Sequence, residues 1–86
     1  MVRNQLAIII PAFNEESTIQ SVIKSVSFIG NVIIIDDGSL DNTVTNAAEA
    51  GAFVHSHIIN LGYDRALNTG FKIAEKLGYQ FIITMD

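Results

Sequence analysis

Cysteine is absent from this chain of 86 residues, which also lacks tryptophan and contains a single proline, Pro11. Without cysteine the chain can form no disulfide, thiolate nucleophile or cysteine-ligated zinc site, which excludes thiol redox functions. Basic residues are scarce as well, because five lysines and arginines stand against nine acidic residues and leave a net charge of −4. We therefore expect no nucleic-acid partner, since no cluster of positive charge is present to neutralise a phosphate backbone.

Long apolar runs are also missing. The apolar stretch at residues 6–10 ends at Pro11 and is soon followed by Glu15 and Glu16, so it is too short for a signal sequence or a membrane span. We therefore expect a cytoplasmic protein. With 49% apolar and 16% charged residues, the composition is that of a globular α/β protein, and we expect residues 1–86 to form one small domain.

Strand patterns alternate with helical patterns along the whole chain. Strands are expected at residues 6–10, 32–35, 52–55 and 81–84, and helices at about 19–26, 43–50 and 63–77. Strands joined by helices need right-handed crossovers, which predict a parallel open sheet with helices on both faces. If the fourth strand returns beside the first, the strand order is 3-2-1-4, a Rossmann-like arrangement whose ligand site lies where the winding reverses.

Several residues predict where these elements begin and end. Pro11 is expected to end the first strand because it has no backbone N–H to donate. Ser17 and Gln20 have the spacing of a capping box at the start of the first helix, and Asp41 is placed to cap the second. The third helix is expected to bury one apolar face, made of Leu67, Gly70, Phe71, Ala74 and Leu77.

Carboxylates follow the predicted strands. The apolar run at residues 32–35 stops at Asp36 and Asp37, Glu15 comes shortly after the first strand, and Asp86 follows the fourth. The carboxyl ends of parallel strands share one edge of the sheet, so we expect these four side chains to lie at a common crevice. Such a group of acids suits a nucleotide diphosphate, whose base and ribose donate hydrogen bonds to carboxylates and whose phosphates bring a divalent cation.

A positive partner for the phosphates is also present. Arg65 falls in the first turn of the third predicted helix, and a helix N-terminus itself favours anions.

Four segments, in this order, resemble the successive motifs of family 2 glycosyltransferases of the GT-A fold. They cover almost the whole chain: Ile9-Ile10-Pro11-Ala12-Phe13-Asn14-Glu15, Ile34-Ile35-Asp36-Asp37-Gly38-Ser39-Leu40-Asp41-Asn42-Thr43, Asn60-Leu61-Gly62 with Arg65-Ala66-Leu67-Asn68-Thr69-Gly70, and Met85-Asp86. Each motif alone is weak, but four in the expected order make a specific match.

The resemblance implies inverting transfer of a sugar from a nucleotide-diphosphate sugar to an acceptor. By this similarity Pro11, Ala12 and Glu15 would line the nucleoside pocket, Asp37 or Asp36 would accept a hydrogen bond from the base, and Arg65 would lie near the nucleotide. The family uses a divalent cation, Mn²⁺ or Mg²⁺, and a membrane-associated acceptor or partner is open for the parent enzyme, which would then act at the cytoplasmic membrane face.

The catalytic part of the family's pattern is not found. Asp86 would be the first carboxylate of the family's Asp-x-Asp motif and a weak metal ligand, but the second carboxylate and the later general base have no counterpart in the sequence. Inverting transfer needs a base near the acceptor hydroxyl and a cation near the leaving diphosphate. We therefore expect the N-terminal, donor-binding half of such an enzyme, with weak or absent metal binding and no activity by itself.

Other interpretations stay open. A receiver-like module also gathers acids at a sheet edge, but it places its acid pair after the first strand, whereas Asp36 and Asp37 follow the second. A non-catalytic fragment that binds nucleotide and associates with copies of itself is the more serious alternative, since an uncovered fourth strand promotes association and predicts a homo-oligomer. His55 and His57 are interpreted as surface residues of an edge strand, without a role.

Overall fold

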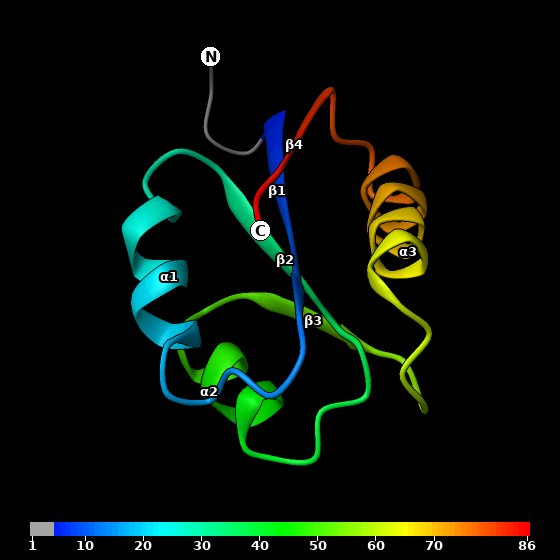
Figure 1. The fold of residues 1–86 in the computed structure, drawn as a ribbon. Helices are drawn as coiled ribbons and strands as arrows, with labels where there is room; N and C mark the ends of the chain where they lie inside the picture. Colours follow the sequence, from blue (N-terminus) through cyan, green and yellow to red (C-terminus); the bar gives the residue numbers. More distant parts are fainter. Residues whose placement is uncertain (1–4) are drawn as a thin grey trace.

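The structure, a computed structural model, describes residues 5–86 and contains one four-stranded parallel sheet with three helices (Figure 1). The strand order is β3-β2-β1-β4, which confirms the predicted 3-2-1-4 topology. The elements follow one another as β1 (Leu6–Ala12), α1 (Ile19–Val26), β2 (Asn31–Asp36), α2 (Thr43–Glu49), β3 (Phe53–Ser56), α3 (Tyr63–Lys76) and β4 (Phe81–Thr84).

β1 is the centre of the sheet and is buried on both faces. It pairs with β2 on one side, where Ile10 lies opposite Ile34, and with β4 on the other, where Ile9 lies opposite Thr84. Successive side chains of a strand point to opposite faces, so a strand covered on both sides needs apolar residues at every position. Residues 6–10 are all apolar and meet this need. β1 is therefore a buried central strand, and the first loop at the carboxyl edge of the sheet extends from its end.

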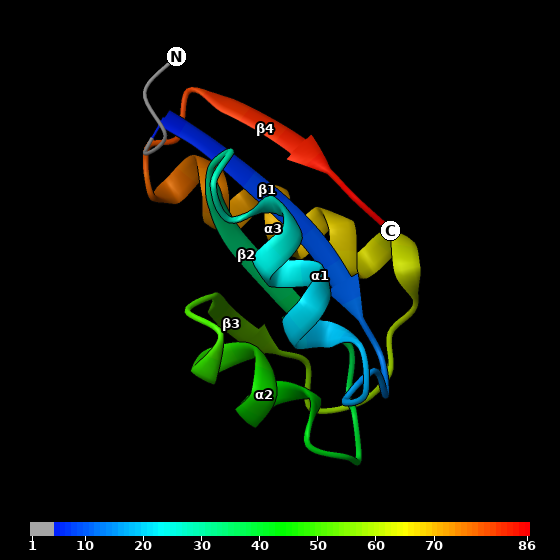
Figure 2. The same cartoon turned by 90° about the vertical axis from the view of Figure 1, so that its left-hand side faces the viewer.

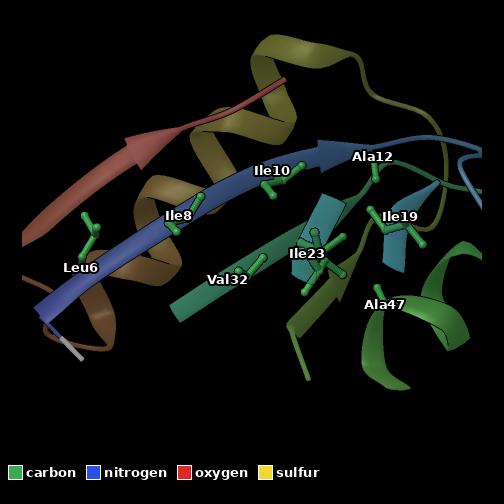
Figure 3. Packing of buried hydrophobic residues seen from close by; sticks show 9 residues of the cluster. Leu6, Ile8, Ile10, Ala12, Ile19, Ile23, Val32 and Ala47 are labelled. Carbon is green, nitrogen blue, oxygen red and sulfur yellow. The ribbon is translucent and has the colours of Figure 1, made fainter. Parts of the chain in front are cut away.

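The helices form two layers, as predicted. α1 and α2 cover one face and α3 covers the other (Figures 1 and 2), so that in Figure 2 α1 and α2 lie in front of the sheet and α3 lies behind it. Beneath α1 and α2, side chains of β1 and β2 interlock with Ile19, Ile23 and Ala47 (Figure 3). Full burial of an isoleucine side chain contributes about 1.5–3 kcal/mol, so this layer supplies much of the free energy of folding.

α3 contacts the sheet through small residues. Its buried positions are Ala66, Gly70 and Ala74, which are spaced by four residues and form a narrow stripe. A Cβ atom at Gly70 would lie 2.4 Å from Cγ2 of Ile9, so the helix approaches the sheet more closely than any side chain there would allow. The predicted apolar face was partly wrong, because Phe71 and Leu77 are exposed and the small-residue stripe faces the sheet instead.

Several strand boundaries differ from the prediction, since β2 is one residue longer at each end and β3 ends one residue later than expected. β1 does not end at Pro11 but continues to Ala12, with Pro11 opposite Ile35 of β2. The carbonyl of Ala12 accepts from Asp37 on the β2 side, so by alternation Pro11 faces the β4 side, where pairing has already ended beyond Ile9. The missing N–H of Pro11 is therefore not needed. β3 begins at Phe53, one residue later than expected.

The predicted capping box of α1 is not formed. The residue before the helix is Thr18, and no side chain caps it. The carbonyl of Glu15 accepts from the N–H groups of Thr18 and Ile19, while Gln20 donates to the carbonyl of Asn46 in α2. The side chain that was expected to cap α1 therefore joins the two helices of one layer.

Candidate functional site

Two loops interlock at the carboxyl edge of the sheet, one after β1 and one after β2. Asn14 has a left-handed backbone with φ of 52°, and its N–H donates to Ser39 Oγ while its side-chain oxygen accepts from the N–H of Leu40. The N–H of Glu15 donates to Oγ1 of the fully buried Thr43 at 2.7 Å. These bonds fix the backbone at Glu15, so the position of this carboxylate depends on the second loop as well as on its own.

The loop between β3 and α3 closes against the same two loops. Gly38 has φ of +84°, and a Cβ atom there would lie 2.8 Å from the backbone nitrogen of Asn60. Only glycine combines this conformation with such a close approach. The loop after β2 is therefore shaped to receive the segment that leads into α3.

A cleft of about 250 Å³ opens between these segments. It is bounded by the end of β1, by the loop before α3 and by the first turn of α3, and its lining residues are Pro11, Ala12, Phe13, Glu15, Asp37, Asn60, Gly62, Tyr63 and Ala66. Four of the seven predicted site residues are among them. The sequence prediction did not include the two aromatic residues of the cleft, Phe13 and Tyr63, because neither carries a charge. Both are about half exposed in the structure.

Asp37 is the most connected side chain of the cleft and is only 5% exposed. Its Oδ1 accepts from the N–H of Leu61 and contacts Nδ1 of His57, and its Oδ2 accepts from the N–H of Gly62. Burial would raise the pKa of Asp37, but the hydrogen bonds from His57, Leu61 and Gly62 outweigh that effect and hold its pKa below the ordinary value. The carboxylate is therefore ionised at neutral pH.

Asp36, the other predicted acceptor, lies deeper, is only 2% exposed and is not among the lining residues. Its Oδ2 accepts from the N–H of Ser39, whereas its Oδ1 is buried without a hydrogen-bond partner within residues 5–86. The N-cap residue of α2 is Asn42 and not, as predicted, the preceding residue Asp41. Oδ1 of Asp41 accepts from both the N–H and the hydroxyl of Thr43, and these bonds lower the pKa of Asp41.

His57 contradicts the interpretation made from the sequence. Its side chain is 8% exposed rather than on the surface, and its two ring nitrogens lie 2.8 Å from Asp37 Oδ1 and 2.8 Å from Thr69 Oγ1. The alternation of His55 and His57 in an edge strand predicted two exposed rings, but β3 ends at Ser56 and the chain turns inward. No local pattern in the sequence shows this turn.

Arg65 and Asp86 lie outside the cleft lining. Arg65 is in the first turn of α3, as predicted, and its side chain is exposed. Asp86 is also exposed and follows β4 by two residues, so the register that pairs Thr84 with Ile9 brings it level with Pro11. It therefore belongs to the same edge of the sheet, on the β4 side of the cleft.

The described residues do not fit a divalent cation. Across residues 5–86 no group of three or more histidine, aspartate or glutamate side chains is arranged to hold a metal ion. Since Mn²⁺ and Mg²⁺ take several oxygen ligands, an exposed Asp86 does not make a site by itself. No catalytic step through a metal is therefore assigned to these residues.

The comparison with protein families decides the affiliation. The model of "Glycosyl transferase family 2" matches residues 7–86. The chain belongs to this family. An uncharacterized protein of Methanocaldococcus jannaschii is 38% identical over 86 residues, which cover 98% of this chain and 35% of that protein. A second relative is the UDP-N-acetylglucosamine–dolichyl-phosphate N-acetylglucosaminyltransferase of Methanococcus voltae. It is 31% identical, and the match covers 100% of this chain and 42% of that enzyme.

Solved structures agree with this affiliation to glycosyl transferase family 2. Glucosyl-3-phosphoglycerate synthase of Mycobacterium tuberculosis superposes with a TM-score of 0.70 at 32% identity, over 83% of this chain and 30% of that enzyme. The same enzyme has been crystallised with Mn²⁺, UDP-glucose and phosphoglyceric acid, a structure that superposes with a TM-score of 0.64 at 35% identity over 76% of this chain and 27% of that one. A mannosyltransferase of Pyrobaculum calidifontis, in complex with GDP-mannose and Mn²⁺, superposes with a TM-score of 0.74 at 21% identity over 86% of this chain and 25% of that one, and supports the fold.

The chain spans about a third of the length of the curated relatives described here, between 35% and 42%. The Methanococcus voltae relative is named as a transferase that uses a nucleotide sugar, and the description of the matched family is that of glycosyl transferases. Within residues 5–86 no helix has both the length and the apolar character needed to cross a bilayer.

Proposed function

We propose that this chain forms the donor-nucleotide half of an inverting glycosyltransferase and binds the nucleoside part of a nucleotide-diphosphate sugar in the cleft beside Asp37. The main support for the proposal is the cleft, whose lining contains two carboxylates, Glu15 and Asp37, and two half-exposed aromatic residues. Carboxylates accept from base N–H and ribose O–H groups, and aromatic rings provide flat apolar surface for a base.

Asp37 rather than Asp36 is the better acceptor for the base. An ionised carboxylate offers about four lone-pair positions, and Asp37 uses three of them for Leu61, Gly62 and His57. The remaining position is on Oδ2, in a side chain that lines the cleft. Asp36 also has an unused oxygen, but it is covered by protein and is not part of the lining.

The phosphates would extend from the cleft toward Arg65 and Asp86. Arg65 supplies a fixed positive charge at the beginning of α3, and Asp86 would contribute one carboxylate to a divalent cation of the whole enzyme. Within residues 5–86, no group of three or more histidine, aspartate or glutamate side chains is arranged to hold a metal ion beside the phosphates. We therefore expect the purified 86-residue chain to bind nucleotide weakly and to show no sugar transfer.

Calorimetry on the 86-residue chain tests this function. We expect UDP, GDP or dTDP to bind with a dissociation constant of about 0.1–1 mM, with little change when Mn²⁺ is added. Glu15→Gln should weaken binding about fivefold, because its carboxylate lines the cleft, whereas Glu16→Gln is the matched control, since Glu16 is exposed and outside the lining. Absence of binding by all three nucleotides, or equal losses in the two variants, would reject the assignment.

The β4 edge supports a second proposal, that the chain associates with copies of itself. Phe81 and Ile83 are 49% and 45% exposed, and Phe81–Thr84 contains no charged residue or proline to protect the open edge. Unprotected edge strands of this kind pair with other chains. Light scattering at micromolar concentration should give a mass above that of the monomer, and Ile83→Lys should restore the monomer. A monomeric mass for the wild-type chain would refute the proposal.

A further inference from the structure

His57 joins three segments that meet at the cleft. Its Nδ1 lies 2.8 Å from Oδ1 of Asp37, which follows β2, and its Nε2 lies 2.8 Å from Oγ1 of Thr69 in α3. His57 itself follows β3, and its N–H donates to the carbonyl of Asp36. A buried ring bonded through both nitrogens has a fixed orientation, so it can fix the groups it contacts.

We infer that His57 is a positioning residue for the nucleotide, which holds the Asp37 carboxylate in the cleft by a hydrogen bond from Nδ1 while Thr69 holds the opposite ring nitrogen. The inference rests on the proposed function, because it concerns the same cleft. His57 does not line the cleft, and it acts on a bound nucleotide only through Asp37.

The hydrogen-bond partners determine which ring nitrogen carries a proton. An ionised carboxylate can only accept, so Nδ1 of His57 donates to Asp37. The hydroxyl of Thr69 has one hydrogen, which it gives either to the carbonyl of Arg65, 3.0 Å away, or to Nε2 of His57. In the first case the ring is protonated on both nitrogens, and in the second it is neutral with its proton on Nδ1.

Both charge states therefore keep the bond from Nδ1 to Asp37, and only the direction of the Thr69 hydroxyl changes. Within residues 5–86, two titratable groups that face the ring are Asp37 and His55, and the ring of His55 meets that of His57 edge to face with centroids 6.2 Å apart. From α3 the contacting group is the uncharged hydroxyl of Thr69. The bond from His57 to Asp37 therefore does not depend on the direction in which the Thr69 hydroxyl points.

The position of Asp37 matters because the same carboxylate also holds the loop before α3. Leu61 and Gly62 donate to it through their N–H groups, and Gly62 is the N-cap residue directly before α3. Gly62 and Tyr63 line the cleft. If the ring of His57 is removed, the carboxylate can rotate, and both the acceptor for the base and the cleft wall lose their fixed positions.

The test uses the 86-residue chain and four variants, with UDP as the probe. His57→Gln should weaken UDP binding about tenfold and Thr69→Val about threefold, because a hydrogen bond to a charged group is lost directly or loosened through its neighbour. His55→Gln is the matched control, since His55 lies two residues before His57 and shares the ring contact but not the bond to Asp37, and the UDP affinity of this variant should be unchanged. Thr69→Ser keeps the hydroxyl and should restore wild-type affinity.

Two NMR measurements separate positioning from a general structural role. The ¹⁵N spectrum should show that neutral His57 carries its proton on Nδ1. In His57→Gln, amide hydrogen exchange should accelerate about tenfold at Leu61 and Gly62 but not at Ile9 and Ile34 in the sheet, because one local clamp is lost. Uniform acceleration at all four amides, or a proton on Nε2 in the neutral ring, would overturn the inference.

The outcomes distinguish the two proposals. If the wild-type chain binds UDP and His57→Gln binds it equally well, the inference about His57 fails and the proposed function stands. If the wild-type chain binds no nucleotide, the proposed function fails and the nucleotide-positioning role of His57 fails with it, whatever the exchange rates show.

Discussion

The two ends of the sheet each carry a hollow, and the larger one has the poorer chemistry for a nucleotide. At the amino end, a hollow of about 350 Å³ lies among residues that include Ile23, Val32, Phe53 and Tyr79, without a carboxylate in its lining. At the carboxyl end, the smaller cleft of about 250 Å³ contains Glu15 and Asp37. Between these two hollows, volume alone would favour the amino end, so the arrangement of hydrogen-bonding groups has to decide.

The loops at the two ends of the sheet also differ in the hydrogen bonds that hold them together. At the carboxyl end, three loops are held together by side-chain bonds to backbone N–H groups, including those from Glu15 to Thr43 and from Gly62 to Asp37. At the amino end, the side-chain bond from Asn31 to the hydroxyl of Tyr79, at 2.7 Å, joins β2 to the turn before β4. A rigid polar framework is what a binding site needs, because groups held in place lose little freedom when a ligand binds.

Among substitutions at the two ends of the sheet, removal of the Asp37 side chain should have the largest effect on stability and on UDP binding. Asp37→Ala leaves the N–H groups of Leu61 and Gly62 and the ring of His57 without their shared acceptor, and we expect a loss of about 3 kcal/mol in the free energy of unfolding, together with loss of UDP binding. Urea unfolding and calorimetry measure the two effects. A stability within about 0.5 kcal/mol of the wild type would show that the carboxyl-end framework does not depend on this side chain.

Two glycines with positive φ allow a matched test of loop packing at the two ends. Gly38, at the carboxyl end, would place a Cβ atom 2.8 Å from backbone, whereas Gly51, in the turn before β3, has open space around it. Gly51→Ala should cost about 1 kcal/mol through backbone strain alone, and Gly38→Ala about 1–2 kcal/mol more through the clash. Thermal unfolding of both variants measures the difference, and equal losses would contradict the close approach of the loops.

The hydroxyl of Thr43 tests the bond that fixes the backbone of Glu15. Thr43→Val keeps the shape of the side chain but leaves the N–H of Glu15 without its acceptor, so we expect a loss of about 1–2 kcal/mol in a urea titration. Thr45→Val on the exposed side of the same helix is the control, with a change within about 0.5 kcal/mol. If the two variants behave alike, the interlock of the loops contributes nothing to stability.

The pH dependence of stability should also report on the carboxyl end. Because the folded-state pKa of Asp37 lies below its ordinary value of 3.8, its contribution to stability is complete above that value and is lost as the pH falls through the folded-state pKa. Asp37→Asn should remove this part of the acid-induced loss, which unfolding titrations between pH 2 and pH 6 would detect. An unchanged acid profile in Asp37→Asn would show that other carboxylates account for it.

The smallest effect is expected at the amino end. Tyr79→Phe removes the hydroxyl that accepts from Asn31 in a half-buried, uncharged pair, so the free energy of unfolding should fall by only about 0.5–1 kcal/mol. UDP affinity should not change. A loss as large as that of Asp37→Ala would mean that the two ends of the sheet are equally dependent on single polar contacts.

The sequence predicted the architecture because the fold depends on patterns that are local. The apolar runs of β1 and β2, the helical spacing of Ile19 and Ile23, and the two acids at the carboxyl end of β2 are each visible within a few residues. Strand order followed from general rules of connection and handedness. These features were confirmed without any knowledge of contacts between distant residues.

The errors arose where distant residues decide the outcome. Pro11 continues a strand because β4 has already ended beside it, and Gln20 joins α2 instead of capping its own helix. His57 turns inward because Asp37 and Thr69, twenty positions before it and twelve after it, provide partners for both ring nitrogens. Such pairings are not encoded in any local pattern, so only the folded arrangement reveals them.

A ¹H–¹⁵N spectrum of the 86-residue chain, recorded during a titration with UDP, tests the central claim most directly. The account predicts that the largest shifts occur at the cleft, in Ala12, Glu15, Asp37 and Gly62, while residues around the amino-end hollow, such as Gly51 and Tyr79, stay unchanged. Shifts concentrated at Gly51 and Tyr79, or no saturable shift at any residue, would contradict it.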